Sequence, residues 1–347
     1  MGGLAATIAI LGAIVAYQHF DLQHSERFLR ADAQVQLALA HSGMQPTTTI
    51  VSTQGLLRKP YSEITVDLPA SASLEQSMDA LNSALVASKL QVLSTKELTA
   101  GDDVGYFLHL GVDETPTHLL FIRSPKAQVA LLFDDFGYTN NRKLLDAFFA
   151  GLNVPFSVAI IPGTTFAVEI AEVAHDSGKE ILVHMPMQPQ GEYVNDYQWM
   201  VCQGMTHEEI RTSVHNAIAS VPYARGLNNH MGSFVTTRKD LITPVLEVVQ
   251  EDGLYFVDSR TISSSIAHAT AQELNVATTY NCVFLDNEKN PEYIRNQFRQ
   301  LVSLALEQGW AVGLGHCHPT TVSAIKDAIS SRDNPRVRYV NISEIVE

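Results

Sequence analysis

Apolar and polar positions follow two different patterns along this 347-residue chain, and the pattern changes near residue 125. Beyond that point, short apolar runs alternate with longer segments in which apolar residues recur every three or four positions. Such alternation is typical of parallel strands joined by crossover helices. It predicts an α/β fold, a (β/α) barrel that we expect to be distorted, with an open doubly wound sheet as the alternative. The predicted strands cover 129–135, 154–162, 180–184, 224–230, 254–258, 277–286, 311–318 and 337–343.

The first third of the chain shows shorter alternating runs around one helical segment, residues 74–88. This mixture predicts a small α+β domain. Residues 22–44 have mixed helical periodicity, which suits a stalk or a connecting helix. We therefore expect three parts, namely an apolar N-terminal segment over 1–20, a connecting helix with a small α+β domain over 21–124, and the barrel over 125–347.

Residues 2–17 are uncharged and mostly apolar, and the first Lys or Arg is Arg27. The run is short for a bilayer span, which needs about 20 apolar residues, and it lacks the basic flank of a cleaved signal. We interpret it as an uncleaved signal-anchor, with a buried N-terminal helix as the alternative. An anchor would place the remaining chain in the cell envelope, on the periplasmic or extracellular side of a membrane.

Composition narrows the class of partner. Apolar residues make up 46% of the chain and charged residues 17%, as in a globular protein. The net charge of −14 argues against nucleic-acid binding, which needs clustered Lys and Arg. Three widely spaced cysteines are too few for a disulfide framework or a Cys-rich zinc site. Of these, we interpret Cys317, which lies between two histidines, as a small buried residue.

Five of the predicted strands end in residues that can bind a metal or transfer a proton. A (β/α) fold places the C-terminal ends of its parallel strands on one face, so residues far apart in sequence converge there. A stable core alone would not require acids and imidazoles at these positions. The strand ends are Asp134–Asp135, His184, His230, Asp258, and His316 with His318.

Asp134 and Asp135 are adjacent carboxylates that repel each other, and burying them without a counter-charge would be costly. A divalent cation removes this problem, because one carboxylate can bind it while the other stays free as a base. The alternative is a pair at a helix N-cap. With His184 and His230 the set offers three ligands and open positions for water, as a catalytic metal site requires. Zn²⁺ is our first choice of cation, although such a set also holds other divalent ions.

Other strand-end residues suit supporting roles. His316 has the near-neutral pKa needed to protonate a leaving amine. His318 is a candidate for an additional ligand, a substrate contact or a loop-fixing group. We expect Asp258 to orient a ligand histidine or the catalytic acid, with an ion pair to a nearby arginine as the alternative. Asn228 and Asn229 are candidate substrate-binding residues.

These motifs, taken in order, resemble those of a known family. The chain is similar to the NodB-homology polysaccharide deacetylases and, more closely, to the divergent polysaccharide deacetylase family. The resemblance covers about residues 126–345 and not the first third. It rests on DDFG at 134–137, HMPMQP at 184–189, NNHMGS at 228–233, VDSRT at 257–261 and GHCHP at 315–319.

The resemblance implies a distorted (β/α) barrel that holds a metal with an Asp-His-His set. Carried over to this chain, it makes Asp134 the base, Asp135 and His184 metal ligands, and His316 the acid. The sequence departs from the NodB pattern at Gln188, where the second histidine of the usual His-x-x-x-His belongs, and in the absence of an Arg-x-Pro-Tyr motif.

We expect His230, on the next strand, to supply the lost ligand. The leading hypothesis is then metal-dependent hydrolysis of N-acetyl or O-acetyl groups on a cell-envelope polysaccharide. One alternative is another metal-dependent hydrolase, such as a glycosidase that uses Asp134 and Asp258 as its carboxylate pair. A second is a non-catalytic envelope protein that binds a glycan or a partner through a deacetylase-like barrel.

Overall fold

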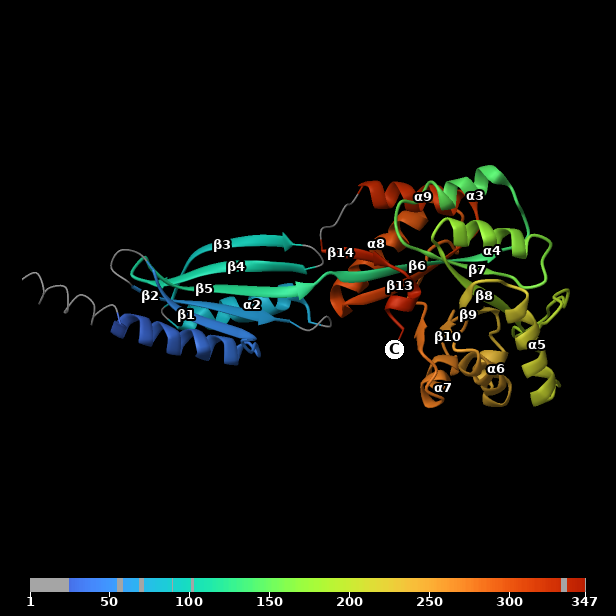
Figure 1. Cartoon of the computed structure of the whole chain (residues 1–347), viewed down its shortest axis with the longest axis horizontal. Coiled ribbons are helices and arrows are strands. Elements are labelled where there is room, and N and C mark those ends of the chain that lie inside the picture. The colour runs from blue at the N-terminus through green and yellow to red at the C-terminus, as the bar shows by residue number, and fades with distance from the viewer. Residues whose placement is uncertain are drawn as a thin grey trace, which may run out of the picture. The chain divides into compact units, whose positions relative to one another are not determined.

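The computed structural model describes residues 25–54, 59–68, 72–88, 90–100, 103–331 and 336–346. The chain divides into two compact units, with the boundary between Lys126 and Ala127 (Figure 1). The apolar segment predicted over 1–20 lies outside the described residues. Among the helices that are described, none has the length and apolar character needed to cross a membrane.

In its described residues, the first unit combines a five-stranded sheet with two helices (Figure 1). The strand order is β1-β2-β5-β4-β3, in which β2 and β5 are parallel and the other neighbours antiparallel. The helices cover 25–41 and α2 (Leu74–Ala87). The strands are β1 (Thr48–Gln54), β2 (Lys59–Asp67), β3 (Gln91–Ala100), β4 (Asp103–Val112) and β5 (Thr115–Pro125).

The helix over 25–41, predicted as part of a stalk or connecting helix, packs into the core of this unit. Its apolar residues recur every three or four positions and therefore lie along one face. Ala31, Val35 and Leu39 are buried there and pack in the same core as α2 and the strands. The helix buries its apolar face in the core of the small domain, which is thus a two-layer α+β unit.

The second unit is a curled, all-parallel sheet with helices outside it, which confirms the predicted α/β fold class (Figure 1). The strand order is β11-β10-β9-β8-β7-β6-β13-β12, and β14 also pairs with β6. The strands are β6 (Ala127–Phe136), β7 (Ser157–Ile160), β8 (Glu180–Met187), β9 (Ala224–Met231), β10 (Tyr255–Asp258), β11 (Thr278–Tyr280), β12 (Val283–Phe284), β13 (Trp310–His316) and β14 (Val337–Val340).

Helices connect the successive strands of this sheet, except β11 and β12. Their buried residues pack against the outward side chains of the strands in one large apolar cluster. The α-helices are α3 (Arg142–Phe149), α4 (Ala167–Asp176), α5 (His207–Ala219), α6 (Lys239–Glu251), α7 (Ala267–Glu273), α8 (Pro291–Gln308) and α9 (Pro319–Ser331), and the 3₁₀-helices are η1 (Val235–Thr237) and η2 (Ile342–Glu344).

The inner face of the sheet distinguishes a barrel from a doubly wound sheet, which would carry helices on both faces. Inward side chains from several strands, such as Leu132, Leu182 and Leu314, pack against one another in a separate cluster. The predicted strand over 277–286 splits into β11 and β12, at opposite ends of the strand order. The two residues between them thus carry the chain from one end of the sheet to the other. The fold is a distorted barrel.

Candidate metal centre

Strand alternation decides which strand-end side chains face the interior. Side chains two residues apart on a strand lie on the same face. Leu132, Leu182 and Leu314 belong to the inner cluster, so the inward positions that follow them are Asp134, His184 and His316. The register supports this arrangement, because His316 of β13 lies opposite Asp134 of β6.

A β-bulge in β6 brings the neighbouring Asp135 to the same site. Between Phe133 and Phe136 the register shifts, so that two β6 residues lie opposite one residue of β7. Asp135 has a φ of 65°, in the left-handed region that few residues other than glycine adopt. Such a conformation costs of order 1 kcal/mol or more and is common where function requires it. It allows two adjacent carboxylates to serve one site.

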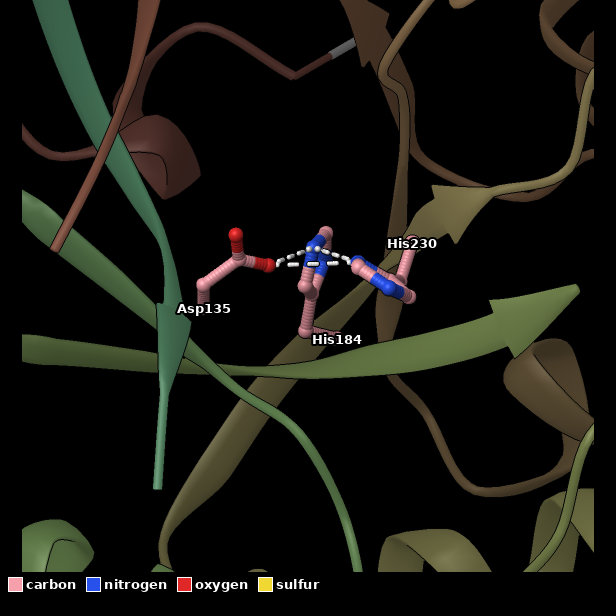
Figure 2. Close-up of side chains that lie close together, drawn as sticks. All are labelled: Asp135, His184 and His230. Atoms are coloured by element: carbon pink, nitrogen blue, oxygen red, sulfur yellow. Dashed lines mark hydrogen bonds and ion pairs between the residues drawn. The ribbon is translucent and has the colours of Figure 1, made fainter. Parts of the chain in front are cut away.

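Asp135, His184 and His230 converge from β6, β8 and β9 (Figure 2). Nε2 of His184 lies 3.3 Å from Oδ1 of Asp135 and 3.1 Å from Nδ1 of His230. The third edge, from Nδ1 of His230 to Oδ1 of Asp135, is 3.2 Å. The three atoms therefore form a nearly regular triangle.

Asn228 determines which nitrogen of His184 carries the proton. Its amide NH₂ donates to Oδ1 and Oδ2 of Asp134, at 3.0 and 3.2 Å, because a carboxylate can only accept. Its carbonyl oxygen therefore faces Nδ1 of His184, at 2.9 Å, and this nitrogen must donate. In the neutral imidazole, Nε2 of His184 then carries a lone pair that points at Asp135 and His230.

The triangle fits a divalent cation. In a tetrahedral site with ligand atoms about 2.1 Å from the ion, those atoms lie about 3.4 Å apart. The three observed separations of 3.1–3.3 Å are close to this value. Moreover, Oδ1 of Asp135 is buried and accepts no well-formed hydrogen bond, although two imidazole nitrogens lie near it. Two imidazole nitrogens and a carboxylate oxygen that converge in this way are what a cation would bind.

Burial and neighbouring charges shift the pKa values of Asp134 and Asp135 in opposite directions. Burial raises the pKa of Asp134 to about 6, although His184 and His316 act in the opposite direction. Burial would also raise the pKa of Asp135, but the imidazoles of His184 and His230 beside its carboxylate outweigh burial and lower that pKa. Asp135 is thus a permanent carboxylate, as a ligand must be, whereas Asp134 is suited to exchanging a proton near neutral pH.

His316 faces Asp134 across the site and is held by Asp286, which follows β12. Its Nδ1 lies 2.7 Å from Oδ1 of Asp286, and its backbone N–H donates to Oδ2 at 3.0 Å. Thr321 also donates to this carboxylate. Burial would lower the pKa of His316, but the bond and charge of Asp286 raise it, and the pKa of Asp286 falls to about 2. Nε2 of His316 remains as the atom that can deliver a proton.

The prediction that Asp258 orients a catalytic residue is wrong. Tyr255 and Val257 face the barrel interior, so Asp258 points outward. Its carboxylate accepts from the backbone N–H of Arg260 at 2.8 Å and from the hydroxyl of Ser265 at 2.7 Å. It fixes the connection to α7, and Asp286 takes the orienting role.

The prediction that Asn228 and Asn229 bind substrate is also wrong. Both are almost fully buried, and their amide groups are already engaged within the protein. Nδ1 of His318 accepts from the N–H of Thr320 at the start of α9, which fits a loop-fixing role, while a substrate contact of His318 stays a prediction. Cys317 is half-buried rather than buried, and desolvation raises its pKa to about 12, which keeps it a thiol.

Two residues near the site were not among the main candidates. Asp286 had only its place at a strand end to suggest it. Tyr197 lies in an irregular segment without periodicity, and its hydroxyl is 2.8 Å from Nε2 of His230. The signal that could have drawn attention to Tyr197 is the cluster of aromatic residues over 193–199, shortly after the His184 motif.

The chain matches one protein family and two curated relatives. Residues 131–346 match the divergent polysaccharide deacetylase family. YibQ, an uncharacterized protein of Escherichia coli strain K12, is 35% identical over 66% of this chain and 70% of its own length. An uncharacterized Haemophilus influenzae protein is 33% identical over 58% of this chain and 70% of its own.

A solved structure is similar in fold. The uncharacterized protein ATU2773 of Agrobacterium tumefaciens C58 superposes with a TM-score of 0.60, over 64% of this chain and 89% of its own, at 19% identity. At that identity the similarity concerns the fold alone, and it agrees with the distorted barrel described above.

Proposed function

This chain belongs to the divergent polysaccharide deacetylase family, and from this premise we propose that it is a metal-dependent hydrolase that removes acetyl groups from a cell-envelope polysaccharide. The observation that supports the proposal best is the triangle of Asp135, His184 and His230, with Asp134 and His316 beside it. These five residues supply the ligands, the base and the acid that amide hydrolysis needs.

A divalent cation held by Asp135, His184 and His230 would lower the pKa of a water molecule towards about 7 and polarise the acetyl carbonyl. The residues around it perform the proton transfers. Asp134 takes a proton from the attacking water as the oxygen bonds to the carbonyl carbon. His316 then gives a proton from Nε2 to the departing nitrogen, and the carbon–nitrogen bond breaks. The products are acetate and a free amine on the sugar.

The arrangement of the remaining groups supports these assignments. Asn228 donates to both oxygens of Asp134 and accepts from His184, so it keeps the base and one ligand in fixed relative positions. Asp286 fixes His316 through Nδ1, which leaves Nε2 for the substrate. Asp258 points away from the interior and cannot pair with Asp134 as a glycosidase would require.

We place the substrate in the cell envelope because the apolar segment over 1–20 is expected to act as a membrane anchor. The net charge of −14 supports a neutral glycan over a polyanionic one, since a polyanion would be repelled. An N-acetylated sugar meets this condition. Its amide also leaves an amine, which is the kind of leaving group that needs the proton of His316.

The test is acetate release from N-acetylated and O-acetylated oligosaccharides, with the chain loaded with Zn²⁺ or Co²⁺ or stripped by a chelator. We expect acetate from the N-acetylated substrate, loss on stripping and recovery when metal is returned. His230→Ala should neither bind metal nor release acetate. Full activity of stripped protein or of this variant would overturn the assignment, and no acetate from either substrate would favour a non-catalytic glycan-binding protein.

A further inference from the structure

Residues 188–201, between β8 and α5, form a segment that is tied at both ends. Backbone bonds join Gln188 N–H to the carbonyl of Val201, at 2.8 Å, and Val201 N–H to that of Pro186, at 3.0 Å. The side-chain oxygen of Gln188 also accepts from the N–H of Gln203 at 2.8 Å. Gln188 stands where the resemblance leads one to expect a ligand histidine, and its side chain closes the base of this segment instead.

The closed segment presents Tyr197 to the metal centre. The hydroxyl of Tyr197 lies 2.8 Å from Nε2 of His230, and the two rings meet edge to face with centroids 5.2 Å apart. Tyr138, whose ring is half exposed, lies near enough to Tyr197 to affect the pKa of its hydroxyl. His230 is therefore contacted on one nitrogen by Tyr197 and faces Asp135 and His184 with the other.

The proton of His230 has only two possible positions. A neutral imidazole carries one N–H, and a nitrogen can bind a cation only if it carries none. With the proton on Nδ1, it would bond to Asp135 and close the site to metal. With the proton on Nε2, Nδ1 is free for the cation, but the buried N–H then needs an acceptor. The hydroxyl oxygen of Tyr197 is the acceptor at that position.

We infer that Tyr197 is a positioning residue that makes His230 a metal ligand, by accepting a hydrogen bond from Nε2 and so leaving Nδ1 free. The inference rests on the metal centre of the proposed function and adds the residue that completes it. In this chain, the segment closed by Gln188 and the ligand supplied by β9 act together. The side chain of Gln188 closes the segment, the closed segment positions Tyr197, and Tyr197 orients His230 so that Nδ1 is free to bind metal.

The experiment measures the dissociation constants of Zn²⁺ and Co²⁺, by competition with a chromophoric chelator, for metal-free wild type, Tyr197→Phe and Tyr193→Phe. Tyr193 is the matched control, because it lies in the same segment and its hydroxyl contacts Cys202 at 3.8 Å. We expect Tyr197→Phe to raise both constants about 10- to 100-fold, as is usual when a partner of a ligand histidine is lost. Tyr193→Phe should bind as wild type does.

Two further readouts separate positioning from a general structural effect. The unfolding temperature of the metal-free proteins should be the same in all three, because the phenyl ring of the variant keeps its packing. The visible spectrum of the Co²⁺ form should change in Tyr197→Phe alone, since the coordination of His230 changes. Unchanged metal affinity in Tyr197→Phe, beside a wild type that binds metal, would overturn this inference only. A wild type that binds no metal would contradict the proposed function itself.

Discussion

Each of the two units buries a histidine beside an aspartate, but the two arrangements differ in how their polar atoms are satisfied. In the first unit, His118 of β5 is fully buried and its two ring nitrogens have separate partners. Nε2 lies 3.1 Å from Asp32, and Nδ1 lies 3.0 Å from the hydroxyl of Thr117. The ring stacks on Phe28 with centroids 5.3 Å apart. Nothing further is needed to complete this contact.

In the second unit, nitrogens of His184 and His230 point at each other and at a carboxylate oxygen of Asp135 that lacks a well-formed hydrogen bond. Both arrangements are buried and both pair imidazole with carboxylate. The comparison therefore shows that burial and proximity alone do not indicate chemistry. The distinguishing feature is the convergence of two imidazole nitrogens on a buried carboxylate oxygen that lacks a hydrogen-bond partner, which a bound cation would satisfy.

The largest effect on activity should follow from removing the proposed base of the second unit. Asp134→Asn keeps the ligand triangle but cannot take a proton, so turnover should fall by about 10²- to 10⁴-fold. Metal content should stay at the wild-type level, as measured by elemental analysis beside the acetate assay. His118→Gln is the matched control in the first unit and should leave turnover unchanged. A fully active Asp134→Asn would remove Asp134 from the mechanism.

A second prediction concerns the orientation of the acid. Asp286→Asn removes the charge that raises the pKa of His316. The acid form must be protonated to act, so activity is lost as pH rises through that pKa, and lowering the pKa moves this loss to lower pH. Turnover at neutral pH should fall about 10-fold or more, because the imidazole also loses its fixed orientation. An alkaline limb that does not move in the pH–rate profile would contradict the role of Asp286.

The sequence alone was enough to predict which residues lie at the strand ends. Strand-end residues at positions 134, 135, 184, 230 and 316 were identified because parallel strands bring their C-terminal ends together. Which way each side chain points depends on strand phase. In the VDSR segment either Asp258 or Ser259 could have faced the interior, and the structure places Asp258 outside.

The contacts that loop residues make with the site could not be predicted from the sequence pattern. Asp286 follows a two-residue strand, and its hold on His316 requires the pairing of β12 with β13, which no local periodicity reveals. We expected Asn228 to bind substrate, but it is fully buried in the barrel, where its amide bonds to both Asp134 and His184. Sequence reasoning thus predicted the fold class and the convergence of the strand ends, but not the groups that hold the proposed site residues in place.

A smaller effect is expected on stability, which metal binding should raise in the second unit only. A cation that binds only the folded second unit should stabilise it by about 2.7 kcal/mol when its concentration is 100 times the dissociation constant. Backbone amide exchange should slow in β8 and β9 when Zn²⁺ is added, whereas β4 and β5 should not change. Equal protection of both sheets would show that the cation acts elsewhere or on both units.

The smallest effect is expected in the first unit. Burial lowers the pKa of His118, although Asp32 partly offsets this. The unfolded chain then takes up a proton before the folded one, so the stability of this unit falls as pH drops below about 6.5, the usual value for histidine. His118→Gln should reduce this acid dependence and lower the free energy of unfolding by about 1–2 kcal/mol. Chemical denaturation at pH 7.5 and 5.5 measures both effects.

The most direct test of the contrast is the metal content of the chain from Arg27 onward, purified without added metal. It should be measured beside a His184→Ala/His230→Ala double variant and a His118→Ala variant. We expect close to one divalent cation per chain in the wild type and in His118→Ala, and none in the double variant. No cation in any of the three, even after Zn²⁺ or Co²⁺ is added, would contradict the metal centre, as would equal content in all three.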